Sequence, residues 1–75
     1  MRIETRVIVL DDNDRELEPG TQCGIWRTSG EYEVGVFDRV ENGKLHFKHV
    51  YGKTEFSHRP STIERVDRVR IEIVE

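Results

Sequence analysis

Alternation of apolar and polar residues dominates both ends of the chain and predicts a β-strand at each end. Residues 2–10 and residues 69–73 follow this pattern. The apolar positions are Ile3, Thr5, Val7 and Val9 in the first segment, and Val69, Ile71 and Ile73 in the second. A period of two is typical of strands with one buried face. Because the two segments share one pattern, we expect them to be neighbours in the folded domain.

Turn signals divide the middle of the chain into two hairpins. Ser29-Gly30 separates residues 21–28 from residues 31–40. Asn42-Gly43 is the dipeptide that best suits a type I′ turn, in which both central residues take positive φ. With a two-residue loop at each turn, the inward-facing residues are Cys23, Ile25, Val34, Val36, Val40, Leu45, Phe47 and Tyr51. The two turns independently place Val34 and Val36 on one inner face, which supports both registers.

The segment after the hairpins predicts one more strand and a short helix. Gly52-Lys53 is a further turn signal, and residues 54–57 follow it as a strand. Ser61 and Glu64 have the spacing of a helix capping box after Pro60. Only about one helical turn fits before the final alternation. The pattern therefore predicts a single all-β domain over residues 1–75, with five to six antiparallel strands and one helical turn before the last strand.

Three segments resemble the SH3-like barrels. They are residues 17–21 leading into a strand, the Asn42-Gly43 hairpin and the short turn at residues 61–65. Sm-like barrels are the neighbouring alternative, although they usually begin with a helix that this sequence lacks. The resemblance implies a small antiparallel barrel that binds peptides, nucleic acids or partner proteins and does not catalyse a reaction.

Cysteine content and hydropathy indicate the cellular setting. Cys23 is the only cysteine, so no internal disulfide can form, whereas small secreted domains usually depend on several. No apolar run approaches the roughly 20 residues that span a membrane, and no signal peptide is evident. We therefore expect a cytoplasmic protein without membrane contact. Its small size suggests an accessory or regulatory protein of bacteria or their phages.

Candidate metal and catalytic residues do not form a complete motif. Asp12, Asp14 and Glu16 have the spacing that begins a calcium loop, but Leu17 stands where that loop needs glycine. No pair of Cys or His residues has the spacing of a zinc site. We therefore expect no metal and no cofactor.

His49 and Asp38 are the one candidate pair for acid–base chemistry. Both are predicted to face inward near one end of the domain, as a structural hydrogen bond or as an acid–base pair. No nucleophile accompanies them, and Cys23 is predicted to be a buried thiol beside Val36. The sequence therefore predicts a protein that is not an enzyme.

The outer face of the two hairpins is the candidate binding site. Trp26 and Phe37 are predicted to project outward, with Gly24 and Gly35 paired between them. The basic residues beside them are Arg39, His46 and Lys48. Aromatic side chains at a surface favour a protein interface, with a larger complex or a second copy of the chain. In the alternative interpretation the glycines only let the strands bend.

Charge distribution leaves nucleic acid as a second class of partner. The net charge is −3, which disfavours non-specific binding to phosphates. Residues 39–59 nevertheless hold five Lys and Arg residues, only two Glu residues and all three His residues. This basic hairpin predicts RNA or single-stranded DNA binding as the alternative to protein binding.

Overall fold

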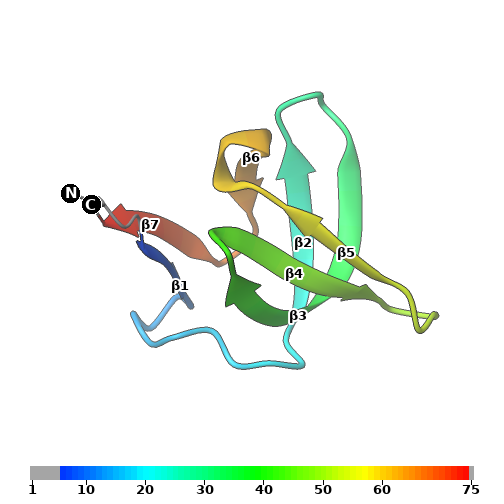
Figure 1. Cartoon of the computed structure of the whole chain (residues 1–75), viewed down its shortest axis with the longest axis horizontal. Helices are drawn as coiled ribbons and strands as arrows, with labels where there is room; N and C mark the ends of the chain where they lie inside the picture. The colour runs from blue at the N-terminus through cyan, green and yellow to red at the C-terminus, as the bar shows by residue number, and fades with distance from the viewer. Residues whose placement is uncertain (1–5, 75) are drawn as a thin grey trace.

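The computed structural model describes residues 6–74, which form strands and one short 3-10 helix (Figure 1). All strand pairs are antiparallel, so the predicted all-β antiparallel class is confirmed. The elements are β1 (Arg6–Leu10), β2 (Gln22–Arg27), β3 (Tyr32–Glu41), β4 (Lys44–His49), β5 (Glu55–His58), η1 (Pro60–Thr62), β6 (Ile63–Val66) and β7 (Arg70–Val74). Residues 2–5 of the predicted first strand lie outside the described residues.

Two separate sheets contain these strands. β1 pairs with β7, as the matching alternation of the two ends predicted, and the other sheet has the order β5-β4-β3-β2-β6. The β1–β7 pair lies at one end of the long axis, and the loop between β4 and β5 lies at the other end (Figure 1). Within residues 6–74 no strand pairing joins the two sheets into a closed barrel.

The hydrophobic core is built around three phenylalanine rings of the larger sheet. The Phe47 ring centroid lies 6.0 Å from that of Phe37 and 5.5 Å from that of Phe56. Such contacts add to the energy gained by burying the rings. The buried apolar residues are Val9, Leu17, Cys23, Ile25, Phe37, Leu45, Phe47, Ile63 and Val66. His58 and Glu33 form a partly buried polar pair beside this core, with His58 Nε2 3.0 Å from Glu33 Oε2.

The loop that joins β2 to β3 contains three residues, 28–30, between the hydrogen-bonded residues Arg27 and Glu31. The β2–β3 register predicted from a two-residue loop at Ser29-Gly30 is therefore wrong by one residue. Gly30 donates its N–H to the Arg27 carbonyl and takes a φ of 92°, and Arg27 donates to the Glu31 carbonyl. This is a three-residue loop whose last residue is left-handed, a geometry that glycine favours. As a result Trp26 pairs with Tyr32, and not with its predicted partner Glu33.

The turn between β3 and β4 is confirmed, but a bulge follows it. Asn42 and Gly43 both have positive φ, at 53° and 72°, as the type I′ prediction requires. Cα pairing runs as predicted from Glu41 to Arg39 and then shifts by one residue before Phe37. An extra residue in one strand changes which face every later side chain occupies.

Together the loop and the bulge invert the predicted faces in the first half of β3. Phe37 is 5% exposed and belongs to the core, whereas Val34 is 38% exposed and Val36 is half-buried. Tyr51, predicted inward, is fully exposed in the β4–β5 loop. The inward faces of β2 and β4 are confirmed, since Cys23, Ile25, Leu45 and Phe47 are all buried.

The predicted helical turn over residues 61–65 is shorter, and its capping box does not form. η1 spans only Pro60–Thr62, and its N-cap residue, Arg59, makes no side-chain capping bond. Ile63 and Val66 follow at once in β6, which pairs with β2 and buries both side chains. β-Branched residues suit a strand better than a helix, and β6 brings the described strands to seven.

Candidate functional site

Trp26 and Tyr32 form a cross-strand aromatic pair on the outer face of the larger sheet. Their ring centroids lie 4.7 Å apart with the planes tilted by 48°. Arg65 of β6 places its guanidinium carbon 5.2 Å from the centroid of the Trp26 ring, which is cation–π distance. Tyr32 of β3 and Arg65 of β6 therefore both contact the Trp26 indole from neighbouring strands. Tyr32 is the more exposed member of the aromatic pair, at 49%.

Gly24 creates the space that the Tyr32 side chain occupies. A Cβ atom at position 24 would lie 2.5 Å from the Tyr32 hydroxyl oxygen and 3.0 Å from Asp67 Oδ2. Gly24 pairs with Val34, and not with Gly35 as predicted. The glycine therefore lets a phenol lie across the strand.

Four exposed apolar residues, here called the outer-face patch, include Tyr32 of this aromatic pair and extend beyond it. They are Tyr32, Val34, Val50 and Tyr51. Val34 follows Tyr32 on the same face of β3, and it lines a groove together with Val50 and Tyr51. The groove has a volume of about 610 Å³ and also contacts Gln22, His49, Gly52 and Thr54.

The lining of this groove is uncharged in a strongly charged protein. Asp, Glu, Lys and Arg make up 36% of the sequence. Among the residues that the structure describes, none of these four types lines the groove. Depletion of charge and enrichment in aromatic residues distinguish the centre of a protein interface from ordinary surface.

Of the predicted binding residues, Phe37 does not reach the outer face. Its ring packs edge-on against Phe47 in the core, so the predicted strip between Trp26 and Phe37 does not exist. Trp26 is on the predicted face, where its β3 neighbours are Tyr32, Val34 and Val36 in place of the predicted Phe37. The large size of Phe37 relative to Val36 was the available signal that position 37 faces the core.

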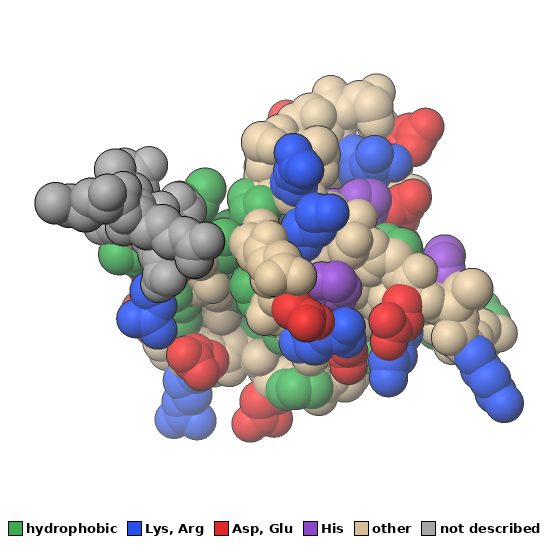
Figure 2. Space-filling model, viewed as in Figure 1, with side chains coloured by type: hydrophobic (Ala, Val, Ile, Leu, Met, Phe, Trp, Pro, Cys, Tyr) green, Lys and Arg blue, Asp and Glu red, His purple; other side chains and the backbone are tan. Residues whose placement is uncertain are grey.

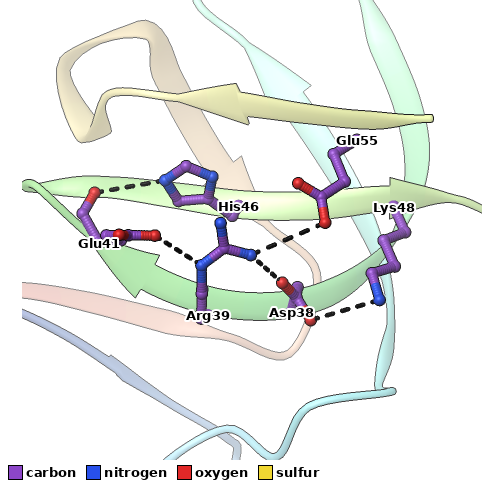
Figure 3. Close-up of polar contacts among 6 residues, drawn as sticks. All are labelled: Asp38, Arg39, Glu41, His46, Lys48 and Glu55. Carbon is purple, nitrogen blue, oxygen red and sulfur yellow. Dashed lines mark hydrogen bonds and ion pairs between the residues drawn. The ribbon is translucent and has the colours of Figure 1, made fainter.

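Arg39, His46 and Lys48 are brought together, but among acidic side chains (Figure 3). The Arg39 Nε atom lies 2.7 Å from Glu41 Oε2, and its Nη1 atom bonds to Asp38 and lies 3.8 Å from Glu55. Lys48 and His46 contact the same cluster, through Asp38 Oδ1 at 3.7 Å and the Glu41 carbonyl at 3.3 Å. Figure 2 shows acidic and basic side chains interspersed on this face.

Two members of this cluster, Arg39 and Glu41, shift each other's pKa. Hydrogen bonds to Glu41 and Asp38 raise the pKa of Arg39, and the bond from Arg39 lowers the pKa of Glu41. The stabilisation from the Arg39–Glu41 contact is fully present above the pKa that Glu41 has in the unfolded chain. It is lost as the pH falls through the pKa of Glu41 in the folded protein. Exposed ion pairs of this kind contribute little to folding.

Cys23 is buried, as predicted, although it pairs with Gly35 and not with Val36. Burial raises the pKa of its thiol, an effect opposed by a backbone hydrogen bond from Phe37. A raised pKa lowers the fraction of Cys23 present as the reactive thiolate.

We expect iodoacetamide at pH 8 to alkylate Cys23 of the native protein roughly a hundredfold or more slowly than Cys23 of the protein in urea, because a folded domain exposes such a thiol only in a small unfolded fraction. Mass spectrometry of timed samples measures both rates, and equal rates would contradict the burial.

Two carboxylates of the acidic turn after β1, those of Asp11 and Asp14, make contacts within the fold. Asp11 Oδ1 accepts hydrogen bonds from the N–H groups of Asn13 and Arg15, and Asp14 lies 2.8 Å from Arg70. Within residues 6–74 no group of three or more His, Cys, Asp or Glu side chains is placed to hold a metal ion.

The predicted Asp38–His49 pair does not form. Asp38 lies at the bulge and bonds to Arg39 and Lys48. His49 is exposed and places its ring 4.7 Å from that of Phe56. The bulge separates the two side chains, since it displaces Asp38 from the position that the uninterrupted register gave it.

No known protein family, curated protein or solved structure matches this chain. The structure contains, in residues 6–74, no helix long and apolar enough to cross a membrane.

Proposed function

We propose that this protein is a non-catalytic binding module that contacts another protein through the outer-face patch. The uncharged groove beside Val34 and Tyr51 carries this proposal. Exposed aromatic and β-branched residues there supply apolar area, and the Trp26–Tyr32 pair supplies a rigid neighbour. Such a surface gains binding energy when a partner removes it from water.

We also propose that the fold is a small barrel of the SH3-like kind in a cytoplasmic setting. The strand order of the larger sheet supports this proposal, because β6 returns after a 3-10 helix to pair with β2. The single buried thiol of Cys23 is consistent with a reducing compartment. An SH3-like fold hosts many binding functions, so the argument for function rests on the patch.

Binding of RNA or single-stranded DNA through residues 39–59 stays the alternative proposal. The carboxylates around Arg39 and Lys48 count against it, because phosphate would have to displace Asp38, Glu41 and Glu55. A salt-dependent mobility shift with single-stranded oligonucleotides supports this alternative, and no shift at low salt removes it.

Two matched lysine substitutions test the protein-binding proposal. Val34→Lys places a charge in the groove, and Ile73→Lys places the same charge at an exposed position on β7. A partner captured from native cell extract and then purified should bind the Val34→Lys variant at least about 30-fold more weakly than wild type, the loss that a hot-spot residue causes. Titration calorimetry measures this, and Ile73→Lys should bind normally. Equal affinity of Val34→Lys and wild type would contradict the proposal.

A further inference from the structure

β7 has one edge that no strand covers in the part of the chain that the structure describes. Its other edge pairs with β1 over its whole length. Val69, just before β7, pairs back onto Val66, but β6 and β7 then diverge and a groove of about 310 Å³ separates them. An uncovered edge presents backbone donors and acceptors to any extended chain of suitable sequence.

Hydrogen bonding on β1 determines which groups of β7 face this open edge. The Val9 carbonyl accepts a hydrogen bond from the Leu17 N–H at 2.9 Å, so it points away from β7. Val9 is opposite Ile71 in the β1–β7 pair. In an antiparallel sheet, two opposite residues either exchange both backbone hydrogen bonds or direct their N–H and C=O groups away from each other. The N–H and C=O groups of Ile71 therefore point to the open edge, and those of Ile73 do the same two residues later.

Two apolar side chains of β7 are accessible beside this edge. Ile73 is 56% exposed and Val74 is 44% exposed. The sequence of β7 contains neither lysine nor proline, and its charged residues, Arg70 and Glu72, form an ion pair with each other. A two-stranded ribbon is also the least stable form of sheet, and additional strands stabilise it.

We propose that a second copy of this chain pairs through its own β7, so that two ribbons form one four-stranded sheet. A two-fold axis at Glu72 places Ile71 of one copy opposite Ile73 of the second copy, and the reverse. The outward-facing backbone groups then meet as hydrogen-bonded pairs, and four isoleucines form one apolar cluster. A two-fold dimer uses the same surface on both copies, so that surface must be complementary to itself, as the edge of β7 is in this antiparallel arrangement.

Charge at the axis sets a limit on affinity. Glu72 of each copy lies opposite Glu72 of the other, and like charges directly opposite destabilise a pair. Arg70 Nε lies 3.1 Å from Glu72 Oε1 of its own strand, so each copy brings a cation to the same face. Arg70 also lies 2.8 Å from Asp14, so the resulting dimer gathers two cations and four carboxylates, with the two Glu72 carboxylates nearest the axis.

Sedimentation equilibrium of the full chain tests this proposal with three variants. Wild type should form a dimer whose fraction rises with concentration, and Ile73→Lys should remain monomeric because lysine blocks the edge. Glu72→Gln should tighten the dimer by up to about fivefold, since it removes the like-charge pair. Val34→Lys should leave the dimer unchanged.

The variants also separate this proposal from the proposed function. β7 and the β4–β5 loop lie at opposite ends of the molecule (Figure 1), so failure at one surface leaves the other intact. A wild type that is monomeric up to its solubility limit would overturn β7 pairing. A dimer that survives Ile73→Lys, or one that is lost with Val34→Lys alone, would overturn it as well. Circular dichroism of each variant confirms that the fold is retained.

Discussion

Phe37→Ala is expected to lower the free energy of unfolding by about 3–5 kcal/mol, the usual loss for a buried phenylalanine. Phe37 is 5% exposed and contacts the Phe47 ring at the centre of the core. A domain of this size has a total stability of only several kcal/mol, so the variant should be largely unfolded or close to it. Urea titration followed by the fluorescence of Trp26, the only tryptophan, measures the change.

Tyr51→Ala provides the control for this prediction. Tyr51 is fully exposed, so its loss should change stability by less than about 0.5 kcal/mol. The registers predicted from the sequence demand the opposite order, with Tyr51 inward and Phe37 outward. A small effect at position 37 and a large effect at position 51 would therefore show that the described register of β3 is wrong.

Gly35→Ala is expected to destabilise the domain by about 1–3 kcal/mol through overpacking. A Cβ atom at position 35 would lie 2.6 Å from Phe56 Cζ and 3.2 Å from Phe47 Cβ. At about 4–8 °C for each kcal/mol, the melting temperature should fall by several degrees or more. Differential scanning calorimetry measures the shift.

Gly52→Ala is the matched control for the glycine prediction. A Cβ atom there would make only ordinary contacts, the nearest at 3.4 Å from Thr54 Oγ1, and the residue is exposed. Its melting temperature should stay close to that of wild type. Equal losses for the two alanine variants would mean that the ring of Phe56 does not lie over Gly35.

The sequence predicted the strands well and the faces of β3 poorly. Asn42-Gly43 determines its turn because only a few dipeptides accept positive φ twice. Ser29-Gly30 is less specific, since Gly30 serves equally well as the last residue of a three-residue loop. Each face of β3 holds apolar residues, Val34 and Val36 on one and Phe37 on the other, so alternation alone could not choose between them.

Agreement between the two predicted hairpin registers was misleading for a physical reason. The three-residue loop shifts β3 against β2 by one position, and the bulge at Asp38 shifts it against β4 by one position. The two shifts change the same half of β3, so both predicted registers placed the same wrong residues inward. No residue pattern near Asp38 indicates a bulge. In the folded sheet Asp38 forms ion pairs with Arg39 and Lys48, and these contacts cannot be inferred from the local sequence.

The outer face chosen from the sequence carries a different set of residues from the one predicted for it. Trp26 was identified because β2 is in the predicted orientation. Tyr32 and Val34 were missed with the inversion of β3, and Tyr51 was missed because strand β4 ends at His49 and leaves it in the following loop. The face proposed for binding could therefore be chosen from the sequence, whereas the residues exposed on it required the three-dimensional strand pairing.

Site-specific photo-crosslinking tests the proposed binding surface most directly. Tyr51 is replaced by p-benzoylphenylalanine, which keeps an aromatic ring at a fully exposed position, and the matched control carries it at the exposed Glu64 of β6. After irradiation in native cell extract, position 51 should give a defined adduct with a protein other than this chain that Val34→Lys abolishes, and position 64 should give no adduct with a protein other than this chain. Absence of an adduct at position 51, or the same adducts at both positions, would contradict a binding surface at the outer-face patch.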